Sequence, residues 1–145
     1  MSDYVLPAAL AEIRDDFLGL AVRDRLTLLL DFSNELPELP EEFANHPDLF
    51  ERVAECQSPV FIVVEIRDGL VHLHARAPRE APTTRGFASI LAQGLDSLTP
   101  EEVLAVPDDY PQMLGLNEAV SPLRVRGMSG ILGRAKRQIR EKLAA

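Results

Sequence analysis

Apolar residues recur at steps of three and four near the N-terminus, which is the spacing typical of amphipathic α-helices. The first run consists of Leu10, Ile13, Phe17 and Leu20. It predicts a helix that begins near Pro7. A second run lies in the segment 24–36 and consists of Leu26, Leu29, Leu30 and Phe32. Pro37 and Pro40 end this second helix, because proline lacks the amide hydrogen that a helix interior needs.

The segment 59–77 has the period-two pattern of a β-hairpin. Two runs rich in β-branched residues flank Asp68 and Gly69, a pair suited to the positive φ angles of a type I′ turn. A two-residue turn fixes the register, so the pairs on the core-facing side are Ile66 with Val71, Val64 with Leu73, and Ile62 with Ala75. The other face carries a mixed set, namely Phe61, Val63, Glu65, His72, His74 and Arg76.

Three further helices are predicted in the second half of the chain. Thr83 or Thr84 can cap a helix whose apolar residues are Phe87, Ile90, Leu91, Leu95 and Leu98. Thr99 and Glu102 form a capping box around Pro100. The last helix begins near Ser121 and Pro122, with the apolar stripe Met128, Ile131, Leu132, Ala135 and Ile139, and with Arg134, Lys136, Arg137 and Arg140 left for solvent. The pattern predicts one domain over residues 1–145 that combines helices with a β-hairpin.

Charge is distributed unevenly along the chain. Residues 121–145 hold seven basic side chains and one acidic one, while the whole chain of 145 residues carries a net charge of −8. This balance argues against nucleic acid as a partner, which requires a concentrated positive surface. The arginines of the last helix and the acids of the body are both candidate protein-docking surfaces. No apolar stretch is long enough to cross a bilayer and no leader pattern is visible, so we expect a cytoplasmic protein without membrane contact.

The chain has one cysteine, Cys56, which follows the irregular segment 37–59 and precedes the first hairpin strand. It cannot form an intramolecular disulfide, which favours a reducing compartment. A lone cysteine is often a small buried apolar residue, but a loop that ends on a rigid sheet also suits a nucleophile. Glu55 disfavours the thiolate, so activation would need cations. The candidate cations are Arg52, Arg85 and Arg124.

The three histidines allow two other hypotheses. His72 and His74 alternate onto one strand face like a pair of metal ligands, but a zinc site needs three or four ligands and nothing in the sequence completes the set. His46 could serve as the base of a cysteine hydrolase, although no third residue that would orient it can be identified. We therefore predict no bound metal and keep hydrolysis as a minor alternative.

The segment Val53-Ala54-Glu55-Cys56-Gln57-Ser58-Pro59-Val60-Phe61 resembles the SufE family, the sulfur acceptors that serve cysteine desulfurases in iron–sulfur cluster assembly. Further matches are Arg85-Gly86 and Ser121-Pro122-Leu123-Arg124 with Gly127-Met128, and the resemblance spans nearly the whole chain. The family often has glycine before the cysteine, whereas this chain has Glu55. Cys56 occupies the acceptor position.

The resemblance implies an α+β fold like that of the iron–sulfur scaffold IscU. In this fold helices cover a small antiparallel sheet that contains the β-hairpin, and a third strand would lie near Arg52 and Val53. It implies that Cys56 takes sulfur from a cysteine desulfurase and passes it to an iron–sulfur scaffold. It also implies that the protein stimulates the desulfurase and is an accessory protein rather than a stand-alone enzyme. The supporting residues implied are Gln57, Ser58, Arg85, Gly86, Arg124 and Gly127. No cofactor is expected on this chain, because the pyridoxal phosphate belongs to the desulfurase. A relay to another thio-cofactor pathway and a purely structural interaction module remain alternatives, whereas a cluster scaffold would need more thiolates.

Overall fold

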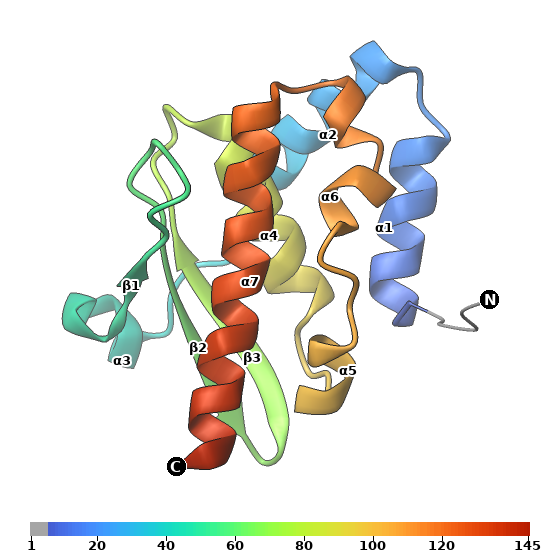
Figure 1. The fold of residues 1–145 in the computed structure, drawn as a ribbon. Helices are drawn as coiled ribbons and strands as arrows, with labels where there is room; N and C mark the ends of the chain where they lie inside the picture. Colours follow the sequence, from blue (N-terminus) through green and yellow to red (C-terminus); the bar gives the residue numbers. More distant parts are fainter. Residues whose placement is uncertain (1–5) are drawn as a thin grey trace.

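The structure is a computed structural model, and it describes residues 6–145. Helices, 3₁₀ turns and strands follow one another in the order α1 (Ala8–Leu18), α2 (Val22–Asn34), α3 (Glu41–Ala44), η1 (Pro47–Leu49), β1 (Glu51–Arg52), β2 (Phe61–Arg67), β3 (Leu70–Arg76), α4 (Pro82–Gly94), α5 (Pro100–Leu104), α6 (Tyr110–Met113), η2 (Leu116–Glu118) and α7 (Pro122–Ala144). Figure 1 shows α7 running beside the hairpin, with α1, α5 and α6 on its other side. The α+β class is confirmed.

The hairpin forms in the predicted register. Val64 pairs with Leu73 and Ile62 with Ala75, and β1 adds the third antiparallel strand by pairing with β2. Asp68 and Gly69 have φ angles of 55° and 77°, as a type I′ turn requires. Both α4 and α7 contact the hairpin, and the side chains of its core-facing pairs are buried apart from the half-buried Ile66.

The opposite face of the hairpin is covered in part by the segment that precedes β1. The Phe43 ring lies 4.4 Å from the His74 ring, measured between centroids, and Phe50 lies beneath the guanidinium of Arg76. The short helices α3, α6, η1 and η2 were not predicted, because each has too few residues to display a hydrophobic period.

The apolar face predicted for α2 was wrong in part. The buried residues of α2 are Arg25, Leu29 and Ser33, whereas Leu26 and Leu30 are 37% and 43% exposed. The reason is the close approach of α4, because a Cβ atom on Gly86 would lie 2.4 Å from the Leu29 carbonyl oxygen. The face of α2 centred on Leu29 therefore packs on α4, and its neighbours one turn away are buried with it.

Three smaller predictions also need correction. Helix α4 begins at Pro82 with Ala81 as its N-cap, and the Thr84 hydroxyl donates a hydrogen bond back to the Ala81 carbonyl. Proline suits this first helical position because its missing amide hydrogen would have no partner there. Leu20 lies beyond the end of α1 and is exposed. Lys136 is buried, since its Nζ donates to the Val106 carbonyl and to Asp108.

The starts of α5 and α7 agree with the sequence pattern. Thr99 and Glu102 make both hydrogen bonds of the capping box, and the Ser121 hydroxyl accepts from the Arg124 amide at the start of α7. The N-cap of α7 matters for the site, because it sets where the first two turns of this helix meet the loop between β1 and β2.

Candidate functional site

Cys56 lies in a compact loop, residues 53–60, that joins β1 to β2. The Val53 amide donates to the Val60 carbonyl over 2.8 Å, which closes the neck of the loop. The Cys56 amide donates to the Val53 carbonyl over 3.1 Å and forms a tight turn before the cysteine. Val53 and Val60 are fully buried. The loop is therefore anchored at both ends in the hydrophobic core, and Cys56 lies between the two anchors.

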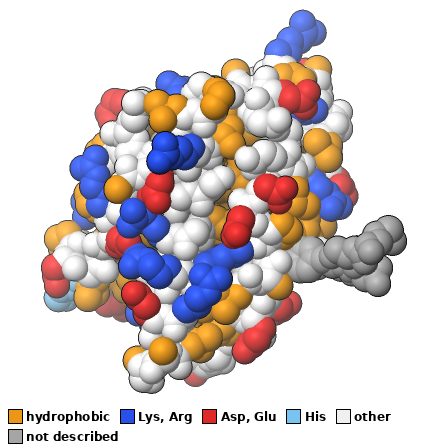
Figure 2. Space-filling model, viewed as in Figure 1, with side chains coloured by type: hydrophobic (Ala, Val, Ile, Leu, Met, Phe, Trp, Pro, Cys, Tyr) orange, Lys and Arg blue, Asp and Glu red, His pale blue; other side chains and the backbone are white. Residues whose placement is uncertain are grey.

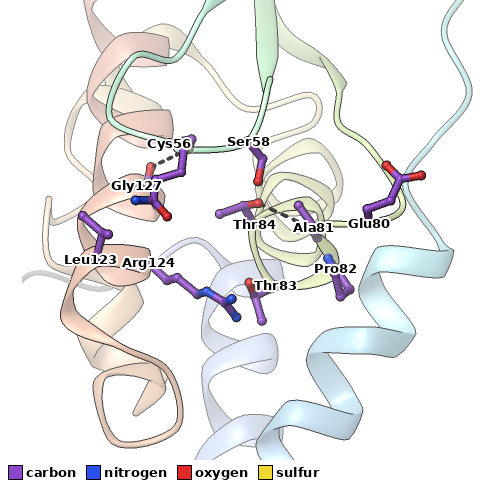
Figure 3. Close-up of a pocket in the computed structure, with 11 residues that line it drawn as sticks. Cys56, Ser58, Glu80, Ala81, Pro82, Thr83, Thr84, Leu123, Arg124 and Gly127 are labelled. Carbon is purple, nitrogen blue, oxygen red and sulfur yellow. Dashed lines mark hydrogen bonds between the residues drawn. The ribbon is translucent and has the colours of Figure 1, made fainter.

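The Cys56 side chain points at α7. Its Sγ donates a hydrogen bond to the Gly127 carbonyl oxygen over 3.4 Å, and the residue is only 4% exposed. Figure 3 shows this bond reaching across from the loop to the helix. The resting thiol is held as a protonated donor and is not presented to solvent.

Two glycines on α7 allow the loop to lie this close to the helix. A Cβ atom on Gly127 would lie 3.1 Å from the Cys56 sulfur, and a Cβ atom on Gly130 would lie 2.7 Å from the Glu55 Cβ. Gly127 and Gly130 are three residues apart and so lie on one face of the helix. Larger residues at these positions would push the loop outward.

The surroundings of Cys56 keep its thiol protonated. Burial is the main cause and raises the pKa of Cys56 to about 11, and the nearby Glu55 carboxylate adds to this rise. The positive charges of Arg134 and Arg52 lower the pKa, but they do not offset the rise. Because the thiolate is the nucleophilic form, the resting thiol is weakly reactive.

A small pocket of about 110 Å³ lies against Cys56. Its walls come from three parts of the fold, namely the Cys56 loop, the start of α4 with the residues before it, and the first turns of α7. Figure 3 shows Arg124 extending from α7 toward Thr83 on α4, beneath Cys56 and Ser58. The pocket places a cation and several hydroxyl groups next to a buried thiol.

The structure brings most of the sequence-predicted site residues together. Gln57, Ser58, Arg124 and Gly127 line the pocket with Cys56. Arg85 does not line it, because its guanidinium donates to the carbonyls of Ser33 over 2.9 Å and Ala77 over 2.5 Å. Arg85 and Gly86 therefore join α4 to its neighbours and support the pocket from behind.

Sequence reasoning missed the ion pairs beside the loop. Arg134 Nε donates to Glu55 over 2.6 Å, and Arg134 Nη1 donates to Glu51 over 2.6 Å. Arg137 also binds Glu51. The hydrogen bond from Arg134 is the main reason that the pKa of Glu55 lies below its ordinary value. The one available signal was Gly127-Gly130-Arg134, at steps of three and four on one helix face.

The histidines do not gather at the site. His74 pairs with Glu65 and His72 with Asp96, and His46 is exposed at the start of η1. Within residues 6–145 no three His, Cys, Asp or Glu side chains lie close enough together to hold a metal ion. None of the helices described in this part of the chain is both long and apolar enough to span a membrane.

The basic face of α7 is largely compensated by acids. Figure 2 shows Lys and Arg side chains along the middle of this face with acidic side chains among them. Arg134 and Arg137 are bound to Glu51, Glu55 and Glu141. Two of the arginines predicted to face solvent, Arg134 and Arg137, therefore form ion pairs within the molecule.

Comparisons with known proteins agree with this fold. The model of the SufE Fe–S metabolism associated domain matches residues 11–139. An uncharacterized SufE-like protein of Mycobacterium tuberculosis is 54% identical over 137 residues, which is 94% of each chain. A solution structure of a hypothetical protein from Thermus thermophilus superposes with a TM-score of 0.84 at 35% identity and covers 97% of this chain and 100% of its own.

A more distant relative has a more specific name. The cysteine desulfuration protein SufE of Plasmodium vivax is 28% identical over 102 residues, which is 69% of this chain and 39% of its own. The family match covers nearly the whole domain, including the Cys56 loop and most of α7. The chain belongs to the SufE family and is a SufE-like protein of iron–sulfur metabolism.

Proposed function

We propose that this protein is a persulfide carrier. Cys56 accepts sulfane sulfur from a pyridoxal-phosphate-dependent cysteine desulfurase and delivers it to an iron–sulfur cluster scaffold. The observation that supports this most strongly is the position of the only cysteine, on an anchored loop against a pocket lined by Arg124. A structural cysteine has no need of a polar pocket at its side.

The proposed step is a thiol exchange that requires no outside oxidant. The Cys56 thiolate attacks the terminal sulfur of the desulfurase persulfide, and a new S–S bond forms to Cys56 as the old one breaks. The desulfurase cysteine leaves as a thiolate and takes up a proton, equivalent to the one that Cys56 lost. One thiol and one persulfide exchange places, so atoms and electrons balance.

The cysteine count suits this role. A second thiol nearby could attack the persulfide on Cys56 and discharge it as a disulfide. The chain has one cysteine and no thiol of its own that could do this. Sulfur on Cys56 then awaits an acceptor on another protein.

The buried resting thiol bears on when transfer occurs. With Sγ bound to the Gly127 carbonyl and the pKa raised to about 11 by burial and by Glu55, Cys56 is a poor nucleophile in the free protein. Transfer requires the loop to move when the desulfurase docks. This arrangement restricts reaction to the intended donor and keeps other thiol reagents from Cys56.

Arg124 has a defined part in this proposal. Arg124 lines the pocket from the first turn of α7 and lies beneath Cys56 in Figure 3. When the Cys56 side chain leaves the Gly127 carbonyl for the pocket, its sulfur approaches this guanidinium. A guanidinium there stabilises the thiolate and the persulfide anion, because an opposite charge favours the ionised form. Arg85 assists only by fixing α4, through its bonds to Ser33 and Ala77.

The test is the effect on desulfurase turnover. Sulfide release from cysteine by the desulfurase is measured with wild-type protein, Cys56→Ser and His46→Ala. A carrier stimulates release and loses this effect in Cys56→Ser, while His46→Ala behaves like wild type. Equal stimulation by Cys56→Ser would mean that the protein is an interaction module and not a carrier.

Transfer to a scaffold, as opposed to another thio-cofactor pathway, is measured as cluster formation when the scaffold complex is added. Fractionation of cells, with detection in the cytoplasmic fraction, tests the compartment.

A further inference from the structure

Two carboxylates near Cys56, one before the turn of residues 53–56 and one within it, bind a single guanidinium. Glu51 belongs to β1 and Glu55 directly precedes the cysteine. Arg134 donates from Nη1 to Glu51 and from Nε to Glu55, each over 2.6 Å. One side chain of α7 thus ties both the start of the loop segment and the residue next to the nucleophile to the helix.

The same face of α7 makes two further close contacts with this turn. Gly127 accepts the thiol hydrogen bond, and Gly130 lies beneath the Glu55 side chain. Arg134 follows one turn later on this face, so that the contacts run from Cys56 outward along a single stripe. The ion pairs of Arg134 with Glu51 and Glu55 lie at the partly exposed end of this stripe.

We propose that Arg134 is a positioning residue that clamps the Cys56 loop onto α7 through Glu55 and Glu51, and that releasing Glu55 from Arg134 exposes the thiol. Its role in sulfur transfer rests on the proposed function, whereas its effect on the loop does not. Arg134 touches no reacting atom and acts only through Glu55.

Glu55 is the side of the clamp that can open. Glu51 is held independently of Arg134, because Arg137 and Gln138 also bind it. Glu55 has Arg134 as its one hydrogen-bonded side-chain partner within residues 6–145. The Arg134 and Glu55 side chains are 27% and 32% exposed, so water and a docking partner can compete for them.

The clamp and a purely electrostatic role for Arg134 predict opposite results. The positive charge of Arg134 lowers the pKa of Cys56, so its loss by itself would raise that pKa and slow the reaction of the thiol. If Arg134 instead holds the loop shut, its loss exposes Cys56 and speeds the reaction. The sign of the change separates the two roles.

The experiment is alkylation of the free protein by iodoacetamide near neutral pH, followed by intact mass. We expect Cys56 of Arg134→Ala to react about two- to tenfold faster than Cys56 of the wild type. The rate follows the fraction of molecules with an open loop, and the loss of a partly exposed ion pair increases that fraction by about this factor. The alkylation rate of Arg134→Lys should lie between those of wild type and Arg134→Ala. Lysine keeps the positive charge but lacks the planar guanidinium that bridges two carboxylates. Hydrogen exchange at the amides of residues 54–58 should rise in the same order.

Arg140→Ala is the matched control, because Arg140 is exposed on the same helix and makes no ion pair among the described residues. It should react at the wild-type rate. An Arg134→Ala protein that reacts at the wild-type rate or slower overturns the clamp. If Arg134→Ala does not fold, Arg134→Lys is judged by the same criterion. No desulfurase is present, so this result and persulfide acceptance can fail independently.

Discussion

The Cys56 thiol and the Gly127 carbonyl oxygen lie 3.4 Å apart, and this hydrogen bond joins the loop cysteine to α7. The bond exists only while the sulfur is protonated, because a thiolate has no hydrogen to donate. Ionisation of Cys56 therefore breaks its contact with the helix and places a charge beside a carbonyl oxygen. Loop closure and thiol reactivity are linked through this pair.

The first prediction concerns the glycines of α7. Gly130→Ala should speed Cys56 alkylation and lower the free energy of unfolding by about 1–3 kcal/mol, because the new Cβ would lie 2.7 Å from the Glu55 Cβ. Gly133→Ala is the control, since its Cβ meets nothing within 4 Å. It should stabilise the protein by about 0.5–1 kcal/mol through helix propensity and leave alkylation unchanged. Urea denaturation and alkylation kinetics check both; equal behaviour of the two variants would contradict the close packing of the loop on α7.

The second prediction concerns stability at alkaline pH. The pKa of Cys56 is raised by burial and by Glu55, from 9.0 to about 11 in the folded protein. Between these values the folded state binds more protons than the unfolded state, so the contribution of Cys56 to stability falls as the pH rises from 9 to 11. The difference in unfolding free energy between wild type and Cys56→Ser should shrink over this window. A constant difference would mean that the thiol has an ordinary pKa.

The third prediction concerns Arg25, a buried arginine on α2. Its guanidinium donates to the carbonyls of Phe17 and Gly115 and to the Glu118 carboxylate. Arg25→Ala removes these three hydrogen bonds, one of them to a carboxylate, and should lower the free energy of unfolding by about 2–4 kcal/mol. Arg23→Ala, at an exposed position of the same helix, should change it by less than about 0.5 kcal/mol. Urea denaturation compares the two, and similar midpoints would contradict the structural role of Arg25.

The fourth prediction concerns Arg124 in the pocket wall. Arg124→Ala should slow single-turnover sulfur transfer from a preloaded desulfurase by about three- to tenfold, because it removes the cation facing the incoming persulfide. Its thermal unfolding should resemble that of wild type, since the exposed side chain carries no buried contact. Arg140→Ala serves as the charge-matched control. Identical transfer rates in the two variants would show that Arg124 has no role in sulfur transfer.

Much of the fold follows from local sequence patterns. The Asp68-Gly69 turn alone fixes the pairing of Val64 with Leu73 and the core face of the hairpin, because side chains alternate strictly along a strand. The capping box at Thr99 and the N-cap at Ser121 also depend on residues close in sequence. These features could be predicted because the groups that form them lie within a few residues of each other.

The remaining features depend on contacts between distant segments. The buried face of α2 is decided by Gly86, which lies on another helix, so the leucine pattern alone misassigned Leu26 and Leu30. The helical pattern placed Arg134 on the solvent face of the last helix, whereas in the folded protein Arg134 binds Glu51 and Glu55. The Cys-Gln-Ser-Pro segment identified the candidate nucleophile, but burial of its thiol is a property of the assembled loop and helix.

Persulfide formation on Cys56 tests the central proposal most directly. The protein is incubated anaerobically with its desulfurase and cysteine, and intact mass and peptide mapping follow. We predict a gain of one sulfur atom on the peptide that contains Cys56, its absence in Cys56→Ser, and its loss when a cluster scaffold is added. A wild-type protein that gains no sulfur while the desulfurase turns over would contradict the carrier role.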